Sequence, residues 1–226
     1  MPSLPTTAGA GSTPAPHYRS AGARRADLGV HLAGLLLALA GGGALVALAA
    51  LRGETAMVRA TIAYVLGLLA MFACSAAYNF AAPTRQPLLR RLDHAGIFFM
   101  IAGSYTPPLA YALAGAWRWS MLATVWGVAL ASAACKLWLP GLGRGFWVAV
   151  YLLLGWVGLA AIGPLWRALD GPVLALIGAG GLVYSLGVAF YLRKGLVYFR
   201  AIWHGHVLAA ALLHWLAILR LVQEAG

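Results

Sequence analysis

Residues 60–82 have the sequence ATIAYVLGLLAMFACSAAYNFAA and contain no charged side chain. A helix rises about 1.5 Å per residue, so roughly 20 apolar residues cross the hydrocarbon core of a bilayer. This stretch is therefore long enough to span a membrane. Comparable apolar blocks lie at residues 28–51, 93–115, 117–139, 145–166, 171–192 and 200–222. The sequence predicts an all-α membrane protein built as a seven-transmembrane-helix bundle.

The composition excludes most soluble classes of protein. Of the 226 residues, 62% are hydrophobic and 9% are charged, whereas about a quarter of residues are charged in soluble domains. The net charge of +11 does not indicate nucleic-acid binding, because the basic residues lie mostly between the apolar blocks, where they contact anionic lipid headgroups. We expect membrane lipids as partners, and the sequence leaves protein partners and the oligomeric state open.

The distribution of basic residues predicts the orientation. We expect residues 1–27, rich in Ala, Pro, Ser, Thr and Gly, to form a flexible cytoplasmic tail before a membrane domain at 28–226. Cytoplasmic loops of membrane proteins carry the excess of Lys and Arg. With a cytoplasmic N-terminus and an external C-terminus, the inner segments hold ten basic residues and the outer segments five, leaving Arg200 aside. This indicates a multi-pass protein of a bacterial-type plasma membrane. Six or eight spans remain alternatives, because the break at 116–118 is weak.

Polar side chains gather at the predicted cytoplasmic end of three blocks. Ser75 and Asn79 are four residues apart near the end of the second block, Asp93 begins the third, and Arg200 and His204 begin the seventh. Residues four apart share one face of a helix, and ionisable groups within spans mark functional sites. Each residue alone also fits an ordinary role, such as helix capping or snorkelling. Because all five lie at one depth in the predicted bundle, we expect them to form a functional site near the cytoplasmic surface.

Further polar residues lie deeper in the third and seventh blocks. Ser104 falls on the face of Asp93 three turns further in, and with Thr106 and the prolines at 107–108 it predicts a polar seam into the bundle. His206 is two residues, or about 200°, from His204, so the two cannot share one helix face. We expect His214 to form an interhelical hydrogen bond.

The chain resembles the hemolysin III branch of the progestin and adipoQ receptor family, which includes the adiponectin receptors. The similar stretches are CSAAY at 74–78, LDHAGIF at 92–98, IAGSYTP at 101–107, AIWH at 201–204 and VLAAA at 207–211, followed by His214. They run in the family's order and spacing from about residue 28 to the end of the chain.

The resemblance implies a site at the cytoplasmic end. In the family, zinc is bound by three histidines, one on the second span and two opening the seventh, with a serine and an aspartate nearby. The arrangement resembles membrane hydrolases that act on lipid amides such as ceramide. Carried over to this chain, the serine is Ser75, the aspartate is Asp93 and the last histidine is His204, whereas Asn79 and Arg200 occupy the other two ligand positions.

These two substitutions weaken the implied zinc site. An amide is a poor substitute for imidazole, and a guanidinium stays protonated and cannot coordinate a metal. We therefore expect zinc, the cofactor implied by the resemblance, to bind weakly to His204 if at all. Our hypothesis is that Arg200 replaces the metal by forming an ion pair with Asp93. A shifted register, in which His94, His204 and His214 act together, is an alternative.

Several functions remain open at this stage. The first is a protein with an eroded zinc site that binds lipid or a membrane partner at a cytoplasmic-side cavity. The second is a metal-dependent hydrolase of lipid amides or esters. A metal-free version would use Ser75 as the nucleophile and His204 as the base, with Asp93 orienting the imidazole. The third, a pore-forming cytolysin, is implied by the family name alone. Whether the chain is an enzyme is left undecided.

Overall fold

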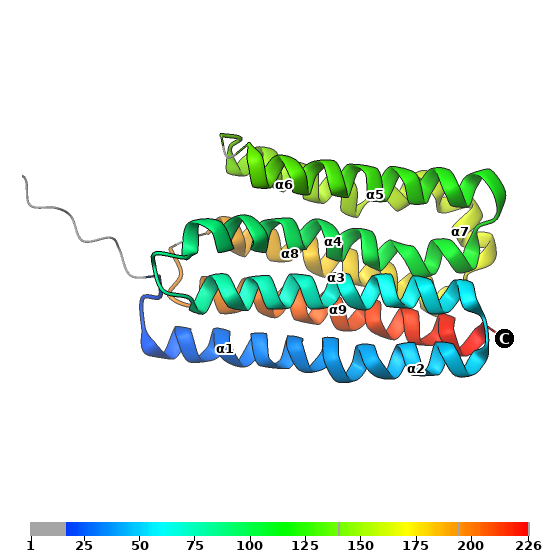
Figure 1. The fold of residues 1–226 in the computed structure, drawn as a ribbon, viewed down its shortest axis with the longest axis horizontal. Coiled ribbons are helices and arrows are strands. Elements are labelled where there is room, and N and C mark those ends of the chain that lie inside the picture. Colours follow the sequence, from blue (N-terminus) through cyan, green and yellow to red (C-terminus); the bar gives the residue numbers. More distant parts are fainter. Residues whose placement is uncertain (1–16, 140, 194, 226) are drawn as a thin grey trace, which may run out of the picture.

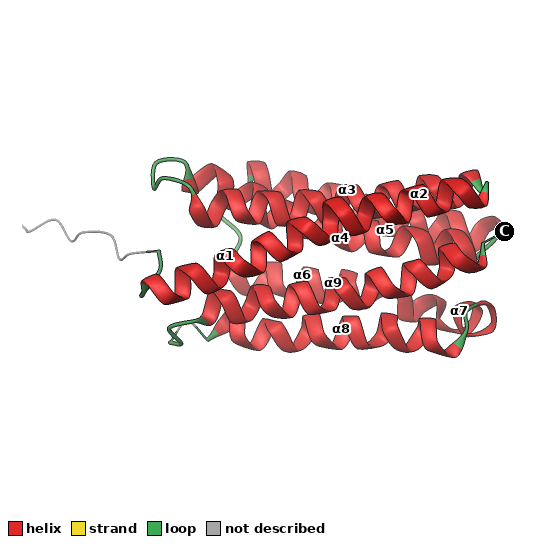
Figure 2. Cartoon of the chain, turned by 90° about the horizontal axis from the view of Figure 1, so that it is seen from below, coloured by secondary structure: helices red, strands yellow, loops and turns green. Residues whose placement is uncertain are grey.

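The computed structural model describes residues 17–139, 141–193 and 195–225, and within these ranges the chain is helical and has no strand. Long antiparallel helices lie side by side (Figures 1 and 2). The elements are α1 (Ala21–Leu36), the π-helical turn η1 (Leu37–Gly41), α2 (Gly42–Arg52), α3 (Thr55–Phe80), α4 (Gln86–Ala112), α5 (Gly115–Trp138), α6 (Arg144–Gly155), the 3-10 turn η2 (Val157–Ala161), α7 (Ile162–Ala168), α8 (Gly171–Leu192) and α9 (Phe199–Glu224).

The described part of the chain contains 6 helices that are long and apolar enough to cross a membrane. Two of them, Ala21–Arg52 and Arg144–Ala168, are formed by consecutive elements. Helix α4 carries Arg90, Arg91 and Asp93 near its start, and it is not among the 6. The prediction of an all-α protein with membrane-spanning helices is confirmed.

The first helix begins earlier than its apolar block. Ser20 caps α1, and its hydroxyl accepts a hydrogen bond from the Ala23 N–H at 3.0 Å, which satisfies one of the free donors at a helix start. Residues 21–27 are therefore helical, and Asp27 is fully buried. The expectation of a flexible tail through residue 27 is wrong for this part, and residues 1–16 lie outside the described ranges.

Glycines bring α3 and α4 into direct backbone contact. A Cβ atom on Gly67 would lie 2.5 Å from the carbonyl oxygen of Phe99, and one on Gly103 would lie 2.9 Å from that of Ala63. Small residues allow membrane helices to approach this closely. The close crossing fixes the alignment of α3 with α4, the helices that carry Ser75 and Asp93.

The break between α6 and α7 is stabilised by one side chain of α4. The Tyr105 hydroxyl donates a hydrogen bond to the Gly155 carbonyl and accepts one from the Gly158 N–H at 3.1 Å. Backbone groups freed by a break must be satisfied inside the protein, because the bilayer core offers no water. Tyr105 thus makes the irregular segment compatible with a membrane position.

Helix α9 packs against α1, α3 and α8. Tyr64 on α3 donates to the Ala211 carbonyl at 3.3 Å, and His214 donates to the Ile177 carbonyl of α8 at 3.3 Å. The predicted interhelical hydrogen bond of His214 is confirmed. These contacts bring the start of α9 beside α1 and the end of α3.

The α3–α4 contact predicts the effect of one added methyl group. Gly67→Ala should lower the melting temperature in detergent, because the methyl meets the backbone of α4 and overpacking costs about 1–3 kcal/mol. Gly127→Ala on α5 is the matched control, since nothing lies within 4 Å of its Cβ position. Thermal unfolding followed by circular dichroism checks both variants. Equal melting temperatures for the two would contradict the close crossing.

Candidate functional site

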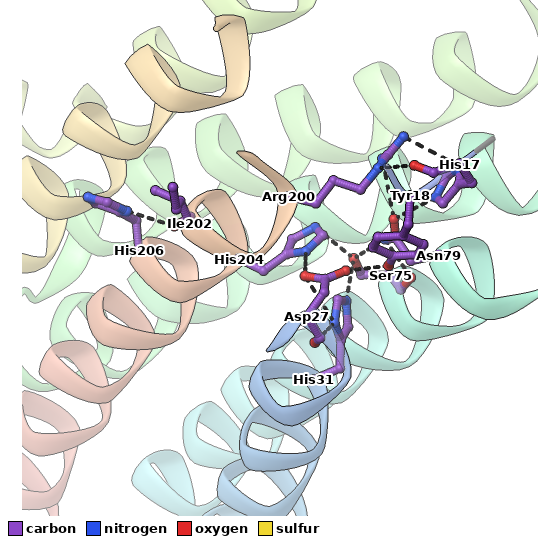
Figure 3. A network of polar contacts seen from close by, with 10 residues as sticks. All are labelled: His17, Tyr18, Asp27, His31, Ser75, Asn79, Arg200, Ile202, His204 and His206. Carbon is purple, nitrogen blue, oxygen red and sulfur yellow. Dashed lines mark hydrogen bonds and ion pairs between the residues drawn. The ribbon is translucent and has the colours of Figure 1, made fainter. Parts of the chain in front are cut away.

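Five buried polar residues from three helices meet near the start of α9 (Figure 3). We call them the α1–α3–α9 cluster, and they are Asp27 and His31 of α1, Ser75 and Asn79 of α3, and His204 of α9. Their exposed fractions range from 0% for Asp27 to 8% for His204. Three of the five, Ser75, Asn79 and His204, were expected at one depth from the sequence.

Two imidazoles flank the Ser75 hydroxyl. His31 Nε2 lies 3.1 Å and His204 Nε2 lies 3.5 Å from Ser75 Oγ. His31 Nδ1 is 2.8 Å from the Asp27 carbonyl oxygen, which can only accept, so this nitrogen carries the proton. In the same way, His204 Nδ1–H donates to Asp27 Oδ1 at 2.6 Å. Asp27 thereby orients both rings.

The buried carboxylate of Asp27 has no Lys or Arg partner among the described residues. Its ion-pair contacts are with His204 at 2.6 Å and His31 at 3.8 Å, and the Tyr18 hydroxyl donates to Oδ2. A buried charge is costly unless it is paired and hydrogen-bonded. Hydrogen bonds from Tyr18 and His204, together with the nearby His31 ring, therefore carry the stabilisation of this carboxylate.

Arg200 lies at the start of α9, and the ion pairs of the described residues do not include one between it and Asp93. Its Nε donates to the carbonyl oxygen of His17 at 3.1 Å, and Nη1 donates to Asn79 Oδ1 at 3.4 Å. The guanidinium also lies over the ring of Phe199. The expected Arg200–Asp93 ion pair is wrong, because the segment before α1 offers acceptors that the sequence alone could not place.

The His17 side chain occupies the space between the two substituted positions. Its Nε2–H donates to Asn79 Oδ1 at 3.0 Å, and its Nδ1 accepts from Arg200 Nη2 at 3.5 Å. Burial lowers the pKa of His17, and the charge of Arg200 lowers it further, while the hydrogen bond to Asn79 acts in the opposite direction. Burial and the charge of Arg200 therefore favour the neutral form of His17.

The three positions that would hold zinc in the resembled family do not fit a metal here. Arg200 occupies one of the family's ligand positions, and its guanidinium lies 3.4 Å from Asn79 Oδ1 at another, so a fixed positive charge stands where the metal would bind. The shifted-register alternative also fails. Among the described residues, the ligand atoms that lie within 4.8 Å of one another belong to Asp27, His31 and His204, and neither His94 nor His214 joins them.

Asp93 does not orient the imidazole of His204. It lies on the wall of a cavity together with Ser75 and His204, but the carboxylate bonded to His204 Nδ1 is that of Asp27. In the predicted metal-free arrangement of Ser75, His204 and Asp93, the acid that orients the imidazole is therefore Asp27 and not Asp93. His206 lies away from the cluster, as expected, and its Nδ1–H donates to the Ile202 carbonyl at 2.8 Å (Figure 3).

The cavity extends from this cluster along the interior of the bundle and has a volume of about 690 Å³. Five basic side chains near helix ends line it, namely Arg90, Arg91, Lys136, Arg144 and Arg200, and Asp93 is the one carboxylate on the described wall. Ser104 lines the cavity, whereas the Thr106 hydroxyl donates to the Ala102 carbonyl and accepts from Trp126 Nε1. The predicted polar seam is thus confined to Ser104.

The sequence analysis missed Asp27 and His31. A usable signal was present, because the two residues are four apart and share one face of α1, as Ser75 and Asn79 do on α3. Asp27 was assigned to the tail only because the apolar block begins one residue later. Tyr18 and His17 carry no comparable signal, since they precede the helix.

Comparisons with known proteins agree with the sequence motifs. A family model described as "Haemolysin-III related" matches residues 27–215. Hemolysin-3 of Bacillus cereus is 36% identical over 140 residues, which cover 61% of this chain and 63% of that protein, so the match spans less than two thirds of that relative. The hemolysin-3 homolog of Bacillus subtilis is 32% identical over 151 residues, 67% of this chain and 71% of its own. Monocyte to macrophage differentiation factor of Homo sapiens is 29% identical over 163 residues, 69% of this chain and 67% of its own.

The contacts of His17 predict a pH-dependent segment. Because the folded state lowers the pKa of His17, its contacts stabilise the segment fully above the ordinary histidine pKa of about 6.5 and are lost as pH falls through the lowered value. Protonation places a second cation beside Arg200, while Asp27 and His204 lie further along the same site. Hydrogen exchange of residues 17–24, corrected for the intrinsic pH dependence, should therefore accelerate at acidic pH. The His17→Asn variant should lack this acceleration, and an identical profile in both proteins would contradict the assignment.

Proposed function

This chain belongs to the haemolysin-III related family of integral membrane proteins, and we propose that it binds a membrane lipid with an anionic headgroup in its internal cavity. The observation that carries the proposal is that five cationic side chains and only one carboxylate are among the described residues that line a cavity of about 690 Å³. The pocket volume lies in the range of about 300–1,000 Å³ that is usual for small-molecule sites.

The charge of the wall selects the headgroup. Lys136 and Arg144 come from the end of α5 and the start of α6, and Arg90 comes from the first turns of α4. Arginine binds phosphate and carboxylate in a bidentate manner, and basic pockets between membrane helices bind anionic headgroups. A headgroup bearing phosphate or carboxylate therefore matches this end of the cavity better than a zwitterionic one.

The remaining wall suits an acyl chain. Away from the basic end, it is lined by apolar side chains of α4, α7, α8 and α9, such as Met100, Leu165, Ile177 and Ile218. Burying a methylene contributes about 0.8 kcal/mol, so a single chain in this space would supply most of the affinity. The proposed binding requires no metal, consistent with the substitution of the family's ligand positions by Asn79 and Arg200.

We also propose that the chain crosses the membrane seven times, with a cytoplasmic N-terminus and an external C-terminus. Helix α4 is 27 residues long and packs closely along α3, which supports its assignment as a span despite its polar start. The cluster and the basic end of the cavity would then face the cytoplasm, where the inner leaflet is rich in anionic lipids.

The headgroup proposal predicts a selective loss of affinity. Native mass spectrometry of the purified chain should show tighter binding of oleoyl lysophosphatidic acid than of oleoyl lysophosphatidylcholine. Arg144→Gln should weaken binding of the anionic lipid by roughly three- to tenfold, since charge-assisted hydrogen bonds near a solvent-exposed mouth are partly screened. Arg193→Gln is the matched control, because Arg193 ends α8 and does not line the cavity. Equal affinity for the two lipids would contradict the proposal.

The topology proposal predicts where a fused reporter is active. Alkaline phosphatase needs disulfides that form outside the cytoplasm, so a fusion after Ala225 should be active and a fusion after Leu196, before α9, should be inactive. An inactive enzyme at Ala225 would show that the C-terminus lies inside. A fluorescent protein that folds in the cytoplasm, fused at the same two positions, should give the opposite pattern.

A further inference from the structure

The contacts of Asp27 lead to an inference beyond lipid binding. We propose that Asp27, His31 and His204 form a binding site for a zinc-type divalent cation, carried by α1 and α9. The three side chains are buried, and their candidate ligand atoms lie within 4.8 Å of one another. This ligand set differs from the three positions implied by the family resemblance, with which it shares only His204.

The donor atoms select the class of metal. Two imidazoles and one carboxylate form a set that is found in zinc sites, whereas calcium and magnesium require mostly oxygen ligands. Asp27 Oδ1 lies 2.6 Å from His204 Nδ1 and 3.8 Å from His31 Nδ1. One ligand atom of each residue lies within 4.8 Å of the other two, and rotation of the side chains would bring all three to one ion.

The charge of the site favours a cation at this point. Asp27 is fully buried and, among the described residues, its ion-pair partners are the two histidines. A divalent ion would take the place of the proton that His204 Nδ1 shares with Asp27 Oδ1. Both imidazoles would bind the ion through Nδ1 as neutral rings, so that in each ring the hydrogen moves from Nδ1 to Nε2 and no proton is gained or lost.

Ser75 and Tyr18 complete the surroundings of the ion. With both Nδ1 atoms on the metal, each Nε2 carries a hydrogen and faces Ser75 Oγ, at 3.1 Å and 3.5 Å. A serine oxygen has two lone pairs and can accept both hydrogen bonds. Metal-bound histidines usually donate their other ring N–H in this way. The Tyr18 hydroxyl binds the second oxygen of Asp27 and so orients the carboxylate.

The hydrogen bonds of Arg200 direct its guanidinium toward the family's ligand position at Asn79. Its guanidinium is held by the His17 carbonyl at 3.1 Å and by Asn79 Oδ1 at 3.4 Å, and the ion-pair contacts of Asp27 do not include it. The hydrogen bonds of Arg200 thus go to His17 and Asn79 rather than to the three proposed ligands on α1 and α9.

The test measures zinc in the purified full-length chain. After treatment with a chelator and addition of Zn²⁺, elemental analysis should find one zinc per chain. Asp27→Asn, His31→Gln and His204→Gln should each weaken zinc binding by roughly a hundredfold or more, because loss of a ligand costs at least as much as loss of its supporting partner. Asp93→Asn and His94→Gln should bind zinc as the unmodified chain does, and Arg144→Gln, which tests lipid binding, should also leave it unchanged.

Two results would overturn the site. One is the absence of stoichiometric zinc in the unmodified chain. The other is loss of zinc in Asp93→Asn together with its retention in His31→Gln, which would place the ion at the family's position. Where a ligand variant fails to fold, Co²⁺ added to the unmodified chain decides: strong visible d–d bands of a four-coordinate ion, removed by Zn²⁺, support the site, and the weak bands of a six-coordinate ion contradict it.

Discussion

A carboxylate buried between membrane helices determines how this end of the protein is built. The two oxygens of Asp27 receive hydrogen bonds from Tyr18, which precedes α1, and from His204 on α9. Neither donor is a neighbour along α1, so the charge can be accommodated only when α9 and the N-terminal segment are both in place. The cost of an unpaired charge in such surroundings exceeds that of most packing defects. Asp27 therefore fixes the position of α1 against α9 more strictly than apolar contacts would.

Two kinds of polar surface lie side by side at this end of the protein, namely the α1–α3–α9 cluster and the wall of the cavity. The α1–α3–α9 cluster satisfies its groups internally, since Ser75 links both imidazoles and Asn79 donates to the Ser75 carbonyl at 2.9 Å. The wall of the cavity instead carries an excess of positive charge that no described acid on it balances except Asp93. An internally paired cluster suits a small cation or a proton. An unbalanced basic wall suits an anionic ligand. The two sites meet at Ser75 and His204, which belong to both.

Much of the helical arrangement was predictable, because span length and turn residues are encoded locally. The apolar block at 171–192 coincides with α8, and the block at 200–222 lies within α9. The depth shared by Ser75, Asn79 and His204 was also predictable from helix direction. Their partners were not, because spacing along one helix does not reveal which helices are neighbours. Arg200 shows the limit most clearly: its charge and depth suggested Asp93, but one of its acceptors is the carbonyl of His17, 183 residues away in sequence, and another is Asn79.

The α3–α4 contact places Asp93 and Ser75 on the wall of the same cavity. The glycines at 67, 96 and 103 bring these two helices together at backbone distance, so α4 is held against one side of α3 while α1 and α9 occupy another. Asp93 of α4 lines this cavity, whereas Asp27 of α1 accepts the hydrogen bond of His204 Nδ1. The glycine contact thus fixes α4, and with it Asp93, against the helix that carries Ser75, while Asp27 reaches His204 from α1.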